Sequence, residues 1–141
     1  MKQFKTGYAT GVFDMFHVGH LRLLQRSKAY CERLIVGVSD DDLVFRLKNR
    51  RPVIPAAERM EIVANISCVD EVVPESTVNK IDAWDSLRFD VTFKGDDWQG
   101  TPKWNKLEAE FALLGVSVIY LPYTREVSTT MLRDRISQAT A

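Results

Sequence analysis

The chain has 141 residues, of which 45% are hydrophobic and 27% charged, and its 19 basic side chains are balanced by 19 acidic ones. This size and balance predict one globular domain over residues 1–141 and argue against a general nucleic-acid binder, which would carry a basic surplus. No apolar run reaches the ~18 residues of a membrane span and no leader pattern follows Met1, so we expect a cytoplasmic protein that binds neither membranes nor nucleic acid.

Short β-branched runs alternate with helical patterns along the chain. Strands are predicted to end at 8–10 and to cover 34–38, 71–73, 91–94 and 116–121, and helices to cover 20–30, 56–66, 80–87, 103–114 and 129–137. This alternation favours right-handed βαβ crossovers, and hence an α/β fold: a Rossmann-like, doubly wound sheet of about five parallel strands with helices on both faces. Ligands bind such sheets at the carboxyl ends of the strands, so we expect the site just after residues 10, 38, 94 and 120.

The segment after the first predicted strand contains both histidines of the chain, His17 and His20. Three positions apart at a helix start, the imidazoles share one face, next to free backbone N–H groups and the positive helix end. That combination favours a phosphate and can stabilise charge that develops on a leaving phosphate. The alternatives are core or surface histidines, or metal ligands. A zinc site is disfavoured because no third and fourth nitrogen or sulfur ligands accompany them, and Cys31 and Cys68 lack metal-binding spacing.

Three motifs carry a resemblance to a known family. Gly11–His20 reads Gly-Val-Phe-Asp-Met-Phe-His-Val-Gly-His, which resembles the signature of the cytidylyltransferase-like nucleotidyltransferases. Ser128–Thr130 is similar to that family's Ser-Thr-Thr motif, and Gly95–Trp98 resembles the Gly-Asp-Asp-Trp segment of the glycerol-3-phosphate cytidylyltransferases. The similarity extends from about residue 8 to residue 136.

The resemblance implies transfer of CMP from CTP to a phosphorylated alcohol by direct in-line attack, with release of pyrophosphate. Glycerol 3-phosphate is the expected acceptor and CDP-glycerol the product, a precursor for a cell-surface polymer such as teichoic acid or capsule. It further implies a homodimer and a Mg²⁺ ion bound through the nucleotide phosphates, with no metal ligated by the protein. Catalytic roles are implied for His17, His20, Lys48 and Arg59, and acceptor binding for Lys80. Nucleotide contacts are implied for Thr10, Gly11, Val12, Phe13, Asp14, Gly19, Gly95, Asp96, Asp97, Trp98, Tyr123, Arg125, Ser128 and Thr129.

A basic cluster, Arg46–Arg51, has four cations in six residues. By itself such a run is typical of a solvated charged face. By resemblance it matches a basic loop over the phosphates, in which Lys48 is the expected key cation. The cluster has no apolar stripe of its own, so we expect it to be mobile until nucleotide binds.

The chain departs from the resemblance at several positions. Tyr123 replaces an arginine that precedes Ser-Thr-Thr, so we expect Arg125 to bind the triphosphate instead. With Val12, the first motif reads Gly-Val-Phe-Asp, which is more similar to that of the phosphocholine and phosphoethanolamine enzymes. The segment Arg51–Pro55 with Arg59 resembles adenylyltransferases that act on sugar phosphates or FMN. Those acceptors therefore stay open as alternatives, and so does ATP as the donor. A non-catalytic nucleotide-binding module is a further alternative, although a protein that only binds nucleotide has no need of two leaving-group stabilisers.

Overall fold

The computed structural model describes residues 2–122 and 129–140 of the chain. Within these ranges five parallel strands form one sheet in the order β3-β2-β1-β4-β5. The strands are β1 (Phe4–Gly11), β2 (Cys31–Ser39), β3 (Glu71–Glu75), β4 (Val91–Gly95) and β5 (Ser117–Leu121). From β1, the chain adds β2 and β3 on one side of the sheet and then β4 and β5 on the other. The doubly wound fold predicted from the sequence is confirmed.

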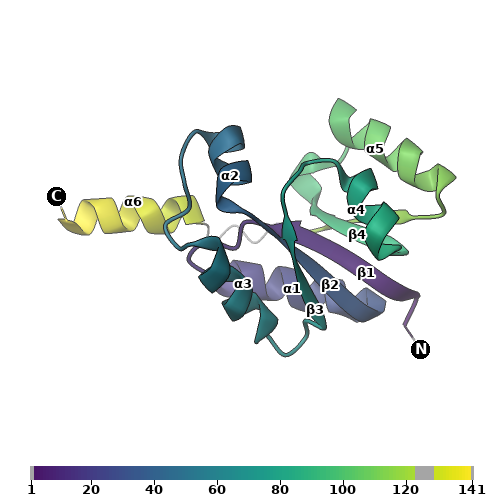
Figure 1. Ribbon diagram of the computed structural model, residues 1–141, viewed down its shortest axis with the longest axis horizontal. Helices are drawn as coiled ribbons and strands as arrows, with labels where there is room; N and C mark the ends of the chain where they lie inside the picture. Colours follow the sequence, from purple (N-terminus) through teal and green to yellow (C-terminus); the bar gives the residue numbers. More distant parts are fainter. Residues whose placement is uncertain (1, 123–128, 141) are drawn as a thin grey trace.

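Helices cover both faces of this sheet (Figure 1). Buried contacts place α1 (Val18–Tyr30) and α3 (Ala56–Ala64) on one face, and α4 (Lys80–Leu87) and α5 (Pro102–Leu113) on the other. A 3-10 turn, η1 (Asp96–Trp98), follows β4 directly. The last helix, α6 (Thr129–Thr140), extends outward from the end of the sheet that is opposite the amino terminus (Figure 1).

The position of β2 inside the sheet explains why its sequence is a continuous apolar run. Leu34 and Val36 pack on the α1 side, whereas Ile35, between them, packs on the α4 and α5 side with Tyr8. A strand that is buried on both faces must be apolar at successive positions, which is why its pattern is continuous rather than alternating. Gly37 belongs to the same strand, and a Cβ atom there would overlap the Tyr8 hydroxyl.

The chain also forms a helix that the sequence reading treated as a basic loop. Helix α2 (Asp41–Lys48) begins at the Asp40 cap, whose carboxylate accepts from the Leu43 N–H at 2.7 Å, and it buries Leu43 and Val44. It ends where Asn49 adopts a left-handed conformation with φ of 55°. The prediction of a loop over residues 46–51 is therefore wrong for residues 46–48, which are helical. The apolar residues that anchor this helix precede the cations in the sequence.

The two thiols are free in this structure, Cys31 buried and Cys68 partly buried, and burial raises the pKa of each. Over residues 2–122 and 129–140, no helix is long and apolar enough to cross a membrane.

Candidate active site

Two adjoining cavities open where β1 and β4 end, at the point where the strand order reverses. The first encloses about 340 Å³ and the second about 220 Å³. They share His20, Leu23, Thr129 and Thr130 as lining residues, so they form one continuous recess between α1 and the start of α6. Many residues singled out from the sequence meet here: Thr10, His17, Gly19, His20, Gly95, Asp97, Trp98 and Thr129 around the first cavity, and Gly11, Val12, Phe13, Asp14 and Lys48 around the second.

The two histidines are fixed at the start of α1 by the helix's own backbone. His17 is the N-cap residue, and its Nδ1 accepts the Gly19 N–H at 3.1 Å. The Nδ1 of His20 accepts the His17 N–H at 3.3 Å, and the two rings stack with centroids 3.8 Å apart. The backbone N–H groups expected to be free for an anion are thus partly used by the imidazoles, whose Nδ1 atoms accept from them.

This arrangement decides the protonation of both rings. A ring nitrogen that accepts an N–H bond carries no proton, so each neutral imidazole is protonated on Nε2. Burial lowers the pKa of His17, and burial together with the charge of His17 lowers that of His20 to about 3, against a smaller opposing effect of Asp14. At neutral pH both rings are therefore neutral Nε2–H donors. The buried Nε2 of His17 has no hydrogen-bond partner among the described residues.

Asp14 is the centre of the loop that precedes these histidines. Its buried carboxylate accepts from the backbone N–H groups of Val53 and Ile54 at 2.8 and 2.9 Å, and from Arg133 at 2.6 Å. Its carbonyl oxygen accepts from the Thr129 hydroxyl at 3.0 Å. Burial acts to raise the pKa of Asp14, but these three donors outweigh it and lower the pKa. The residue therefore stays ionised and ties three segments together.

The backbone around Asp14 is strained. Phe13 and Met15 have φ values of 55° and 48°, in the left-handed region that favours glycine. Such residues persist only where their surroundings over-determine the conformation. Here the hydrogen bonds of Asp14 supply that constraint, and the buried Phe13 ring packs edge-on against His20, 5.3 Å away between centroids.

Arg59 is neither a surface residue nor a lining residue of the described cavities. It is fully buried, and its guanidinium donates to the carbonyl oxygens of Ile54, Val12 and Ser39 at 2.7, 2.7 and 2.8 Å. A further N–H binds the Asp41 carboxylate at 2.7 Å. The resemblance implied a catalytic role for Arg59, but in this conformation its donors hold the loops together. Arg59 is a positioning residue here.

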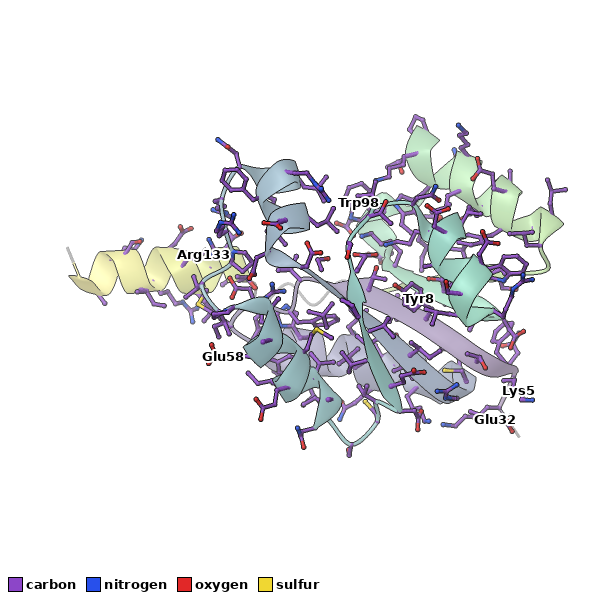
Figure 2. The ribbon with its side chains drawn as sticks, in the orientation of Figure 1. Lys5, Tyr8, Glu32, Glu58, Trp98 and Arg133 are labelled. Carbon is purple, nitrogen blue, oxygen red and sulfur yellow. The ribbon has the colours of Figure 1, made fainter. Side chains whose placement is uncertain are left out.

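Three cations line the second cavity: Lys48, Arg50 and Arg133. Burial and the charges of Arg50 and Arg133 lower the pKa of Lys48, while Asp14 acts in the opposite direction. Cations that lower one another's pKa in a shared recess gain from an anion between them. Arg133, which Figure 2 labels at the end of α6 nearest the body, was not predicted from the sequence, although it stands one helical turn after Thr129 and thus on the same face.

Lys80, the expected acceptor-binding residue, lines neither cavity. Its ammonium donates to the Thr10 hydroxyl at 2.9 Å and forms an ion pair with Glu75 at 2.7 Å. The other oxygen of Glu75 accepts from the Ser39 hydroxyl at 2.9 Å. Lys80 therefore reaches the end of β1 through Thr10, with its charge already compensated.

The end of β4 forms the opposite wall of the first cavity. A Cβ atom at Gly95 would lie 2.6 Å from the Asp97 carboxylate, so the glycine lets that side chain fold back over the strand end. Trp98 is 40% exposed at the cavity, whereas Trp104 on α5 is only 2% exposed, which supports packing for the latter. Asp96 begins η1 but does not line either cavity. Tyr123, Arg125 and Ser128 lie outside the described residues.

Comparisons with known proteins identify relatives of this chain. The model of the cytidylyltransferase-like family matches residues 8–135. The glycerol-3-phosphate cytidylyltransferase of Bacillus subtilis is 36% identical over 130 residues, which cover 90% of this chain and 93% of that protein. The bifunctional protein HldE of Halorhodospira halophila is 40% identical over 127 residues, 89% of this chain. The chain spans only about a fifth to a quarter of the HldE proteins it matches.

Solved structures extend the comparison of the fold. A lipopolysaccharide core biosynthesis protein from Thermoplasma volcanium superposes with a TM-score of 0.72 at 23% identity, over 88% of this chain and 99% of that one. A pantoate-beta-alanine ligase from Francisella tularensis gives a TM-score of 0.62 at 13% identity, over 100% of this chain and 72% of that one. With the sequence matches, the chain belongs to the cytidylyltransferase-like family of nucleotidyltransferases.

Proposed function

We propose that this chain transfers CMP from CTP to a phosphorylated alcohol, with glycerol 3-phosphate as acceptor and CDP-glycerol and pyrophosphate as products. The observation that carries the proposal is the stacked pair His17 and His20. Both rings line the recess where the strand order reverses and carry a neutral Nε2–H, and the buried Nε2 of His17 has no partner within the described residues.

The chemistry that fits this site is a single displacement at phosphorus. An oxygen of the acceptor's phosphate forms a bond to the α-phosphorus of the nucleotide, while the bond from that phosphorus to the bridging oxygen breaks and pyrophosphate leaves. The two imidazoles donate hydrogen bonds to the phosphate oxygens on which charge accumulates. Lys48, Arg50 and Arg133 compensate the charge of the triphosphate from the second cavity. Catalysis then consists of positioning and electrostatic stabilisation, with no covalent intermediate.

Magnesium enters this proposal with the nucleotide. Among residues 2–122 and 129–140, no three histidine, cysteine or carboxylate side chains lie together as metal ligands. An ion bound to the triphosphate oxygens is part of the substrate. The homodimer stays a prediction, which light scattering on the purified chain tests.

The choice of CTP and glycerol 3-phosphate is supported by relatives of matching length. The glycerol-3-phosphate cytidylyltransferases of Bacillus subtilis and Bacillus spizizenii are 36% and 38% identical, over 93% and 90% of their own lengths. A second candidate is transfer of AMP or CMP to a sugar phosphate. The segment Arg51–Arg59, which resembles adenylyltransferases acting on sugar phosphates, favours it.

A pyrophosphate-release assay across the four nucleoside triphosphates and a panel of phosphorylated alcohols separates these candidates. The panel contains glycerol 3-phosphate, phosphocholine, phosphoethanolamine, sugar phosphates and FMN, and mass spectrometry identifies each product. We expect release with CTP and glycerol 3-phosphate together, and formation of CDP-glycerol. Release with ATP and a sugar phosphate alone would favour the second candidate, and a protein that binds nucleotide but never releases pyrophosphate would be a binding module.

A further inference from the structure

We propose that Lys94, at the end of β4, binds the phosphate of the acceptor and is thereby the acceptor-positioning cation of this site. The inference rests on the proposed function in one respect, namely that the acceptor is a phosphate monoester. Lys94 was not singled out from the sequence, and its place in the fold, its surroundings and its lack of a polar partner all bear on the assignment.

Strand β4 ends at the first cavity, and Lys94 lies one residue before that end. Val91 and Phe93 pack on the α1 side of the sheet, so Lys94, next along the strand, points to the α4 and α5 side. It nevertheless lines the cavity with His17 and His20, because the strand ends there. A nucleotide phosphate at the histidines and an acceptor phosphate at Lys94 would thus meet across one recess, as in-line attack requires.

The ammonium of Lys94 has rings rather than acceptors around it. It lies 4.8 Å from the ring centroid of Trp98 and 5.5 Å from that of Trp104. Within the described residues it forms no hydrogen bond and no ion pair under 4 Å. Aromatic faces stabilise a cation but accept no N–H bond of ordinary strength. The three N–H donors of Lys94 therefore remain for a ligand, and a phosphate oxygen is the acceptor that this chemistry favours.

The charges that face Lys94 from the packed elements compensate it only in part. Lys80 on α4 and Lys103 on α5 repel it, while Asp97 on η1 and Glu75 on β3 attract it. Glu75, however, is already bound to Lys80 at 2.7 Å. Burial, followed by the two neighbouring cations, lowers the pKa of Lys94 to about 8. A dianionic phosphate would relieve the repulsion that Lys94 experiences. Lys80 gains less from such a phosphate, because it is already paired with Glu75.

Lys94→Met should raise the KM for glycerol 3-phosphate at least about tenfold, the loss expected for one charge-assisted hydrogen bond. The KM for CTP and kcat should stay within about threefold. Lys94→Arg should restore much of the acceptor affinity. The matched control is Lys103→Met, which removes an exposed cation 6.0 Å from the centroid of the same Trp98 ring. It should leave both KM values within about twofold.

The pH profile gives a readout that a purely structural role would not move. The phosphate of glycerol 3-phosphate is fully ionised above pH ~7. In the wild type, kcat/KM for the acceptor should fall above pH ~8, by about tenfold per unit, as Lys94 loses its proton. In Lys94→Arg it should stay flat to pH ~9.5 because the guanidinium remains charged. A Lys94→Met variant that keeps the pH profile of the wild type, or one whose KM rises only for CTP, would overturn the assignment.

Calorimetric binding of glycerol 3-phosphate, with glycerol as the phosphate-free control, separates the failure of this inference from that of the proposed function. If the wild type shows no turnover but binds glycerol 3-phosphate, and Lys94→Met binds it at least about tenfold more weakly, the proposed reaction is wrong and the role of Lys94 stands. Equal binding by both proteins overturns the role of Lys94 whether or not CDP-glycerol forms. Absence of both turnover and binding in the wild type overturns both.

Discussion

The polar residues around the recess fall into two regions that differ in how their hydrogen bonds are used. The first region consists of Asp14, at the second cavity, and Arg59, behind the recess; both are buried, and each donates to or accepts from several protein groups. At its walls, the Nε2 of His17 and the ammonium of Lys94 have no polar partner among the described residues. Buried polar groups that are fully paired rigidify a structure, whereas unpaired donors beside a cavity are available to a ligand. The first region is therefore a framework and the second the reacting surface.

The framework also explains why the strained loop is stable. Arg59 holds the carbonyl of Val12 from behind, and Asp14 holds the backbone of residues 53 and 54 from the front. The loop between them fixes His17 and His20 relative to α6 through the bond from Thr129 to Asp14. A site that acts by positioning depends on such support as much as on the groups that touch substrate.

The largest effect on stability should come from Arg59→Met. This change leaves three carbonyl groups and the Asp41 carboxylate without their buried donor. Removing one partner of a buried charged network typically costs about 3–5 kcal/mol in the free energy of unfolding. Arg33→Met is the matched control, because Arg33 forms an exposed ion pair with Glu71 and should cost under about 1 kcal/mol. Urea unfolding of both variants measures the difference, and equal costs would mean that the Arg59 network contributes no more than a surface pair.

A smaller effect, with its own pH dependence, is expected for Asp14→Asn. At pH 7 the loss of a carboxylate that accepts three bonds should cost about 1–3 kcal/mol in the free energy of unfolding. The folded pKa of Asp14 lies below that of the unfolded chain, so its stabilisation is complete above the unfolded pKa of ~3.9 and is lost as pH falls through the folded value. The gap between wild type and variant should therefore narrow as pH falls below ~4. A gap that stays constant to pH ~2 would show that the charge of Asp14 plays no part.

The smallest of these effects should come from Lys48→Ala, which acts on the reacting surface. Lys48 is exposed and shares its cavity with two arginines, so we expect the KM for CTP to rise only about tenfold and the free energy of unfolding to change little. Arg46→Ala is the control on the same helical turn, since Arg46 donates to the Ser76 carbonyl and lines neither cavity. If the two variants have the same KM, the cationic cavity does not bind the triphosphate.

Local patterns were sufficient to predict the fold and to single out many of the residues that line the recess, because both depend on the alternation of elements and on residues at strand ends. The buried position of Arg59 could not be predicted from the sequence, because it depends on carbonyl groups at residues 12, 39 and 54, which only the folded chain brings together. Lys94 was missed although strand alternation distinguishes it from Phe93, since its significance comes from the absence of an acceptor nearby. Arg133 could be recognised only from its contact with Asp14, which lies 119 positions away in the chain.

The central claim is that His17 and His20 act as neutral hydrogen-bond donors to the phosphates during transfer. The most direct test is kcat for His17→Ala, His20→Ala and the double variant, with folding verified by circular dichroism. Removing one such donor typically costs about 10²–10³ in kcat, so each single variant should fall by that factor. The double variant should lose less than the product of the two, because the stacked rings serve the same phosphates. A loss under about threefold in a folded single variant would contradict the account.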